Sequence, residues 1–151
     1  MEIVLLCLFV LGLLCHIYTD IKEMLLYDIL SLVLLVAGCI YAYYYGDFLD
    51  SLYGFFAAGG GMLLLYYLSK GGMGEGDVKL AFVLGVWLGF WNSIICLFLA
   101  FISGGLFGSV LLIMRKKSGC DRMPFGPFLC LGGIVAQFYG QKLFSWYLGY
   151  F

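Results

Sequence analysis

The chain has 151 residues, of which 64% are hydrophobic and only 11% are charged, and its net charge is −1. Soluble domains carry about 25% charged residues, so this composition excludes a soluble protein and predicts one that spans a membrane. The length allows a single domain, residues 1–151, with five or six helices of about 20 residues each and no room for a soluble module. No basic tract points to nucleic acid. Glu2 stands where a signal peptide carries basic residues, so the first apolar run is expected to remain as a span.

Successive apolar runs predict an all-α, polytopic bundle of six transmembrane helices. We expect the spans at residues 3–18, 29–45, 51–68, 77–91, 92–114 and 124–139. Gly59, Gly60 and Gly61 in the third span predict close approach of a neighbouring helix, because small residues allow helix backbones to pack tightly. The segment after the sixth span, with Lys142 and Trp146, is expected to lie along the membrane interface.

The basic residues predict the orientation, since short cytoplasmic loops carry the excess of Lys and Arg. Placing the loops after the first, third and fifth spans in the cytoplasm gathers seven of the eight basic residues there. These are Lys22, Lys70, Lys79, Arg115, Lys116, Lys117 and Arg122. We interpret Lys22 and Lys79 as anchors among the lipid head groups. Both chain ends are then expected outside the cytoplasm, in a multi-pass protein of the cell membrane.

The six cysteines give no indication of a metal site. None belongs to a C-x-x-C pair, and five lie inside apolar runs. We therefore expect reduced, buried side chains that behave as small hydrophobic groups. Neither a metal nor a cofactor is predicted.

Two aspartates reach the same depth in this topology. Asp20 closes the first span at the cytoplasmic face, and Asp77 opens the fourth span at the same face. An ionisable side chain costs about 2.5 to 3.5 kcal/mol at the centre of a membrane helix and less near the interface, so its presence indicates a functional group that faces a cavity. Residues 71–76, which read GGMGEG, loosen the backbone just before Asp77. The sequence predicts a small wet pocket around Asp77.

A pair of carboxylates is suited to hydrolysis of a peptide bond. Two such groups a few ångströms apart share one proton near neutral pH. The ionised group activates a water while the protonated group hydrogen-bonds the scissile carbonyl, as in an aspartic protease, and no cofactor is required. The residues alone leave a second class of function open, a non-enzymatic carrier or assembly subunit. Such a protein would use Asp20 and Asp77 to pass protons or to hold a partner helix.

Three motifs resemble those of a known family. GMGEGDVKL at residues 72–80 is similar to the G-x-G-D motif of membrane aspartic proteases, and in the form G-M-G-x-G-D-x-K it closely resembles the type IV prepilin peptidases. DIKEMLLYD at residues 20–28 resembles the first aspartate segment of these enzymes. PFGPFL at residues 124–129 is similar to the start of their last conserved span. The motifs stand in the family's order, and the resemblance covers most of the chain.

The resemblance implies an intramembrane aspartic endopeptidase that cleaves the leader peptide of prepilins or pseudopilins after a Gly, at the cytoplasmic face. Carried over to this chain, Asp20 and Asp77 become the catalytic pair, and Gly74 and Gly76 shape the loop that positions the substrate beside Asp77. The basic leader of such substrates is expected to meet an acidic group. The candidates are Glu23, Glu75 and Asp121.

The chain departs from the family pattern in two ways. Tyr27 replaces the usual proline of the first segment, which predicts a more helical turn after the first span. The cytoplasmic domain with a cysteine zinc cluster, which larger members insert after their first helix, is missing, so N-methyltransferase activity is not expected.

Two further polar residues near the pair have structural interpretations. His16 shares a helix face with Asp20 and either tunes the pair or serves as a structural hydrogen-bonding group. Asp28 is expected to cap the second span, because it stands just before that apolar run.

Overall fold

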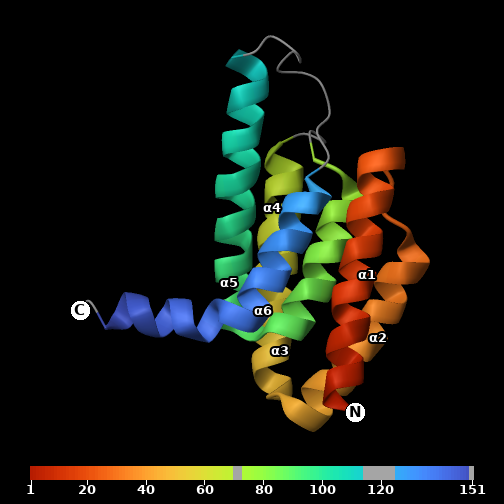
Figure 1. Cartoon of the computed structure of the whole chain (residues 1–151), viewed down its shortest axis with the longest axis vertical. Coiled ribbons are helices and arrows are strands. Elements are labelled where there is room, and N and C mark those ends of the chain that lie inside the picture. Colours follow the sequence, from red (N-terminus) through yellow and green to blue (C-terminus); the bar gives the residue numbers. More distant parts are fainter. Residues whose placement is uncertain (70–72, 114–124, 150–151) are drawn as a thin grey trace.

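The computed structural model describes residues 1–69, 73–113 and 125–149, and every regular element within them is a helix. The all-α prediction is therefore confirmed for this part of the chain. The elements are α1 (Glu2–Glu23), α2 (Asp28–Tyr45), α3 (Phe48–Gly54), the π-helical turn η1 (Phe55–Gly59), α4 (Gly60–Leu68), α5 (Glu75–Ile113) and α6 (Gly126–Leu148). Figure 1 shows a bundle of these helices from which the end of α6 projects sideways.

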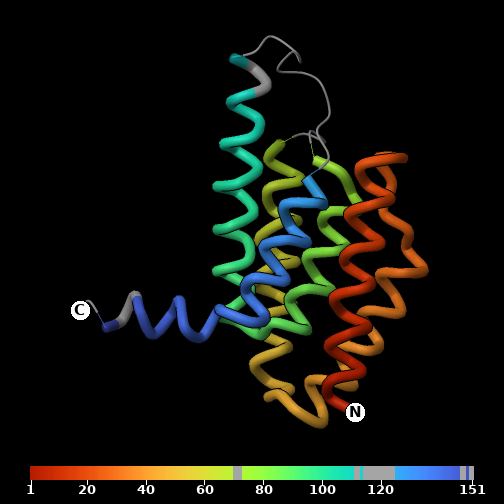
Figure 2. The backbone as a smooth tube through the Cα atoms, in the orientation of Figure 1, coloured from red at the N-terminus to blue at the C-terminus, as the bar shows by residue number. Residues whose placement is uncertain are grey.

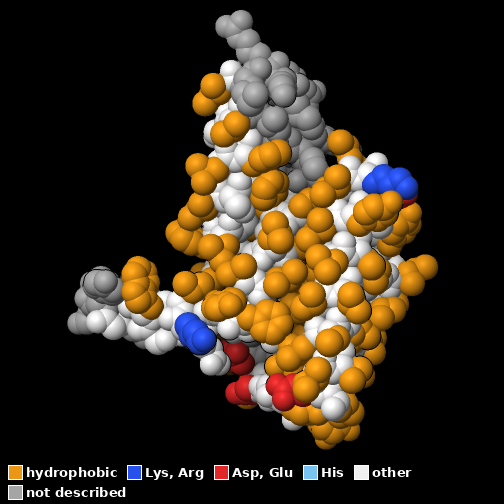
Figure 3. Space-filling model, viewed as in Figure 1, with side chains coloured by type: hydrophobic (Ala, Val, Ile, Leu, Met, Phe, Trp, Pro, Cys, Tyr) orange, Lys and Arg blue, Asp and Glu red, His pale blue; other side chains and the backbone are white. Residues whose placement is uncertain are grey.

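Four helical stretches are long and apolar enough to cross a membrane. They are Glu2–Glu23, Asp28–Tyr45, Phe48–Leu68 and Glu75–Val110. Hydrophobic side chains also cover most of the visible outer surface (Figure 3), which suits contact with lipid. The protein is therefore a helical membrane protein. The sequence predicted six spans, but by length and composition only four of the described helical stretches are candidates.

The difference arises partly in α5, which combines two of the expected spans. Gly89 interrupts it with φ 70° and ψ −174°, a conformation that is essentially restricted to glycine. The chain reverses direction at this bend, so the two halves of α5 run as separate helices (Figure 2). Asp50 of α3 accepts a hydrogen bond of 3.2 Å from the backbone N–H of Phe90 and so caps the second half. The predicted boundary between residues 91 and 92 lies two residues beyond the observed one.

Trp87 holds three helices together at the centre of the core. Its indole N–H donates a hydrogen bond of 2.8 Å to the carbonyl of Leu34 in α2. Its ring packs against Phe9 of α1, at 4.6 Å between centroids, and against Tyr41 of α2, at 5.2 Å. A buried indole needs a partner for its N–H, so this bond makes the aromatic cluster specific to one arrangement of α1, α2 and α5.

Glycines allow the closest contacts between elements. Gly54 and Gly85 meet backbone to backbone, since a Cβ on either one would collide with the other residue's carbonyl oxygen. The predicted close approach in the third span is confirmed at Gly59, where the ring of Phe82 fills the position of a Cβ. It is wrong at Gly60, which has no neighbour within 4 Å.

The cysteines divide between the core and the outer surface. Cys96 and Cys130 are buried, as predicted, whereas three others are exposed: Cys7, Cys15 and Cys39. The prediction of burial is wrong for these three, because an apolar residue in a membrane bundle is compatible with either face. Cys120 lies outside the described residues.

Candidate active site

One end of the bundle brings together three segments that are far apart in the sequence. The end of α1, the start of α5 and the start of α6 lie there, while the N terminus lies at the opposite end (Figure 1). These segments carry Asp20, Asp77 and Gly126 respectively. The predicted coincidence in depth of the two aspartates is therefore present in the structure.

Both aspartates lie near a helix end and are buried there. Met24 ends α1 in the left-handed region, with φ 52° and ψ 33°, and its N–H bonds to the carbonyl of Asp20 at 3.0 Å. At the start of α5, the N–H of Asp77 bonds to the carbonyl of Gly74 at 3.2 Å. Each aspartate is only 6% exposed. Two carboxyl groups are thus withdrawn from the surface at the same end of the bundle.

Gly126, the first residue of α6, lies between the two carboxyl groups. An ideal Cβ on Gly126 would stand 2.5 Å from Oδ2 of Asp20 and 3.4 Å from Oδ1 of Asp77. The distance between the two oxygens is therefore at most the sum of these two distances. One water molecule can bridge such a gap. The Gly126 N–H donates a hydrogen bond to the Asp20 carboxyl group. The sequence did not predict that Gly126, part of the PFGPFL motif, lies beside both carboxyl groups.

A cavity of about 420 Å³ opens beside the pair. Four of the side chains that line it are acids, Asp20, Asp28, Glu75 and Asp77, and Lys79 is the one basic side chain among them in the described part of the chain. The lining also includes the link between α1 and α2. The predicted pocket around Asp77 is present, and its charge favours a cationic ligand.

The two predicted substrate-positioning glycines also line this cavity. A Cβ on Gly74 would stand 3.1 Å from Oδ2 of Asp77, and a Cβ on Gly76 would stand 3.0 Å from Cβ of Leu26. The first glycine therefore leaves room for the aspartate, and the second allows α5 to approach the link after α1. The neighbouring Gly71 and Gly72 lie outside the described residues.

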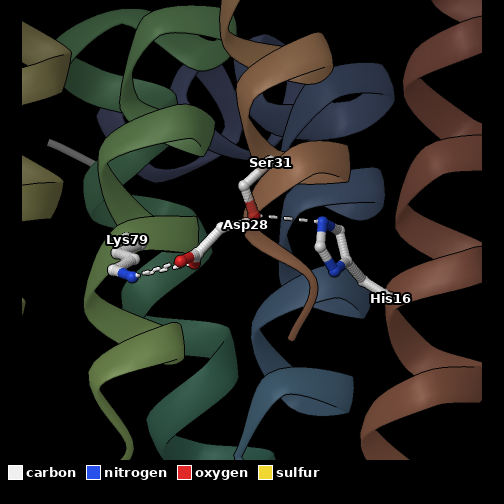
Figure 4. A network of polar contacts seen from close by, with 4 residues as sticks. All are labelled: His16, Asp28, Ser31 and Lys79. Carbon is white, nitrogen blue, oxygen red and sulfur yellow. Dashed lines mark hydrogen bonds and ion pairs between the residues drawn. The ribbon is translucent and has the colours of Figure 1, made fainter. Parts of the chain in front are cut away.

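Asp28 and Lys79 differ from their predicted roles. Asp28 is the first residue of α2 and does not cap it, because Tyr27 occupies the N-cap position without a side-chain bond. Both oxygens of Asp28 accept hydrogen bonds of 2.8 Å from Lys79, which therefore bridges to α2 instead of anchoring in lipid (Figure 4). Lys22, by contrast, stays at the surface beside Tyr18.

The link between α1 and α2 is not the more helical turn that was predicted. Tyr27 has φ −72° and ψ 118°, so it is extended and keeps a φ that proline also adopts. Its hydroxyl donates a hydrogen bond of 2.6 Å to Glu23, and this bond and the charge of Glu23 raise the pKa of Tyr27. Two of the three acids proposed for a basic leader thus have phenolic partners, since Tyr66 donates to Glu75 at 3.1 Å. The third, Asp121, lies outside the described residues.

His16 is fully buried in α1, one turn before Asp20. Its Nε2 lies 3.3 Å from the hydroxyl of Ser31 in α2, which is also buried (Figure 4). His16 therefore makes a hydrogen bond between helices, and a role in tuning the pair stays a prediction. Its partner was not predicted, since nothing in the sequence relates a serine of the second span to a histidine of the first.

Fold and site together define a helical membrane protein with two buried carboxyl groups at the wall of one acidic cavity. The type IV leader peptidase family matches residues 7–109, and the chain belongs to this family.

Several relatives are named prepilin leader peptidase/N-methyltransferase. The chain is 42% identical to the one from Legionella pneumophila over 88 residues, which are 57% of this chain and 31% of that protein. It is 36% identical to the one from Aeromonas salmonicida (strain A449) over 141 residues, 87% of this chain and 47% of the relative. For Pseudomonas aeruginosa the identity is 33% over 145 residues, 91% of this chain and 50% of the relative. The chain thus spans a third to a half of the length of these relatives. No solved structure matches it.

Proposed function

We propose that this protein is an intramembrane aspartic endopeptidase that removes the leader peptide of type IV prepilin-like proteins. In this proposal Asp20 and Asp77 are the catalytic pair, and cleavage follows a Gly at the cytoplasmic face of the membrane. The observation that carries the proposal is the convergence of the two buried carboxyl groups on Gly126 beside an acidic cavity. The names of the relatives support the choice of substrate.

We infer six membrane crossings for this activity. They are α1, α2, the segment from α3 to α4, the two halves of α5, and α6. The end of the bundle that carries the aspartates then faces the cytoplasm, in agreement with the basic residues of the adjoining loops. Of these, Lys22 and Lys79 are described, and five lie outside the described residues: Lys70, Arg115, Lys116, Lys117 and Arg122.

The proposed reaction needs only a water and the two carboxyl groups. The ionised aspartate takes a proton from the water as its oxygen attacks the scissile carbonyl carbon, while the protonated aspartate donates a hydrogen bond and then its proton to the carbonyl oxygen. The resulting tetrahedral diol collapses when a carboxyl group gives a proton to the amide nitrogen, the C–N bond breaks, and the other carboxylate takes a proton from a hydroxyl of the diol. The products are a leader that ends in a carboxyl group and a mature chain with a new amino terminus.

The acidic lining supports a basic leader as the part of the substrate that enters the cavity. Glu75 lies in the first turn of α5, close in sequence to Asp77, and its carboxylate is on the cavity wall. Gly74, which leaves room beside Asp77, gives the substrate backbone access to the reacting groups.

The test uses co-expression of this protein with a prepilin and mass spectrometry of the pilin N terminus. Asp20→Asn and Asp77→Asn each remove one member of the pair with little change in volume. We expect each variant to abolish the new N terminus while the protein remains in the membrane at normal levels.

Asp47→Asn is the matched control. Asp47 lies at the opposite end, where it accepts a bond of 3.0 Å from the N–H of Leu49, and Asn retains that cap. Its variant should process the prepilin normally. Normal processing by either active-site variant would contradict the assignment. A carrier or assembly subunit, the other class of function for such a pair, predicts an unprocessed pilin with every form of the protein, the unmodified one included.

A further inference from the structure

The helices that carry the two aspartates do not pack on one another through their backbones. In the described part of the chain, α1 packs on α2 and α6, and α5 likewise packs on both of these helices. Side chains of α1 and α5 do meet at Phe9 and Trp87, but this contact lies several turns away from Asp20 along α1. The separation of Asp20 and Asp77 therefore depends on the elements that stand between them.

At the aspartate end, α2 contacts both of these helices, as α6 does, and α2 carries two polar ties. Asp28, its first residue, pairs with Lys79 of α5 at 2.8 Å, and Ser31, one turn later, bonds to His16 of α1 at 3.3 Å. Figure 4 shows the two ties leaving α2 toward opposite sides, one to each aspartate-bearing helix.

Each tie ends close to an aspartate on the same helix. Lys79 follows Asp77 by two residues, so their side chains point to different sides of α5. Holding Lys79 against α2 therefore sets the rotation of the first turn of α5 and turns Asp77 inward. His16 precedes Asp20 by one turn on the same buried face of α1, so its bond to Ser31 sets the rotation of α1 in the same way.

We propose that the first turn of α2 is a clamp that sets the distance between the two aspartate carboxyl groups, with Asp28 and Ser31 as positioning residues. The inference rests on the proposed function, because it assigns these residues to the reaction at Asp20 and Asp77. The Asp28–Lys79 pair is exposed, at 68% and 54% of the two side chains, and such pairs add little to stability. Its main effect is then on alignment.

The kinetic test breaks and restores the Asp28 tie. Asp28→Asn and Lys79→Met each remove the ion pair, and we expect each change to lower kcat several-fold, which is the most that an exposed pair of this kind can contribute. KM for a basic leader should rise in Asp28→Asn and fall in Lys79→Met, because the two changes alter the charge of the cavity lining in opposite directions. The double variant Asp28→Lys/Lys79→Asp restores the pair with reversed charges and should regain most of the lost kcat.

The second tie and a control complete the kinetic series. Ser31→Ala removes the partner of His16 and should also lower kcat without raising KM. Lys22→Met removes a cation at the same end of the bundle whose contact, Tyr18, is on its own helix, so kcat should not change. A raised KM at normal kcat in the Asp28 variants would mean that the pair binds substrate and would overturn the proposal. So would a reversed pair no better than the single variants.

A geometric test needs no activity. With Asp20→Cys and Asp77→Cys in one chain, a short bifunctional thiol reagent links the two positions, and mass spectrometry of the linked peptides gives the rate. We expect this rate to fall several-fold on adding Asp28→Asn or Ser31→Ala and to recover with the reversed pair. Equal rates in all backgrounds would refute the clamp. Failure of the unmodified protein to cleave any prepilin would refute the proposed function, and the cross-linking rates would still decide the geometry.

Discussion

Gly126 offers the sharpest single test of the candidate site. Replacing it by Ala adds one methyl group at a point 2.5 Å from Oδ2 of Asp20, 3.1 Å from Cγ of the same residue and 3.4 Å from Oδ1 of Asp77. Among the glycines of the described chain, Gly126 is the one whose Cβ would have both carboxyl groups among its nearest neighbours.

The size of the effect follows from these distances. Non-bonded carbon atoms prefer a separation of about 3.5 to 4.0 Å, and carbon–oxygen contacts are only slightly shorter, so the Asp20 carboxyl group must move by roughly 1 Å. Overpacking of this kind costs about 1 to 3 kcal/mol of stability. A misplacement of about 1 Å at a reacting group costs on the order of 100-fold in rate. We therefore expect Gly126→Ala to lower kcat about 100-fold while most of the protein still folds.

The assay is cleavage of a purified prepilin in detergent or lipid, followed with a thermal unfolding measurement on the same samples. Gly105→Ala is the control, because a Cβ there meets nothing within 4 Å and Ala favours the helix. It should retain full activity. Normal kcat for Gly126→Ala, with normal thermal stability, would show that the carboxyl groups do not need the space beside Gly126, and the argument from convergence would fail.

Three other changes test the fold. Gly85→Ala should lower the unfolding temperature strongly despite the better helix propensity of Ala, because its Cβ collides with the backbone of Gly54. Circular dichroism on heating measures the unfolding temperature, and an unchanged value would contradict the close contact. Trp87→Phe removes the hydrogen bond to Leu34 and should cost about 1 to 3 kcal/mol of unfolding free energy in a denaturant titration, more than a conservative aromatic exchange on the outer surface. Asp50→Ala should cost about 0.5 to 2 kcal/mol and Asp50→Asn much less, since Asn also caps helices; equal losses would exclude a capping role.

The sequence was sufficient to predict which acids lie at the same depth. Hydropathy and the distribution of Lys and Arg are properties of short segments, and they placed Asp20 and Asp77 at one end of the bundle without knowledge of packing. The motif around Asp77 predicted the pocket as well. These predictions depend only on where each residue lies relative to the ends of the spans. That position is the same however the helices pack against one another.

Contacts between helices were not predictable in the same way. The ion pair of Asp28 and Lys79 depends on how α2 and α5 are rotated, and a lysine near a membrane interface is equally well explained by lipid head groups. The exposed Cys7 and Cys15 show a related difficulty, since lipid is as apolar as the core and the hydrophobic pattern does not distinguish the two faces. The bend at Gly89 was predicted only to within two residues, because the sequence does not show which residue between the fourth and fifth spans takes the unusual φ.

Acids in this bundle occur in two contrasting environments, and the contrast supports the proposed roles. Asp50 accepts a backbone N–H at the bend of α5, so its charge stabilises the start of a helix. Asp20 is buried, yet its Oδ2 has no hydrogen-bond partner among the described residues. A buried polar atom without a partner costs about 1 to 3 kcal/mol, which a purely structural acid has no reason to retain. A buried oxygen without a partner that lies near a second carboxyl group, in a residue that lines a cavity, is instead suited to accept a hydrogen bond from a water and to deprotonate it.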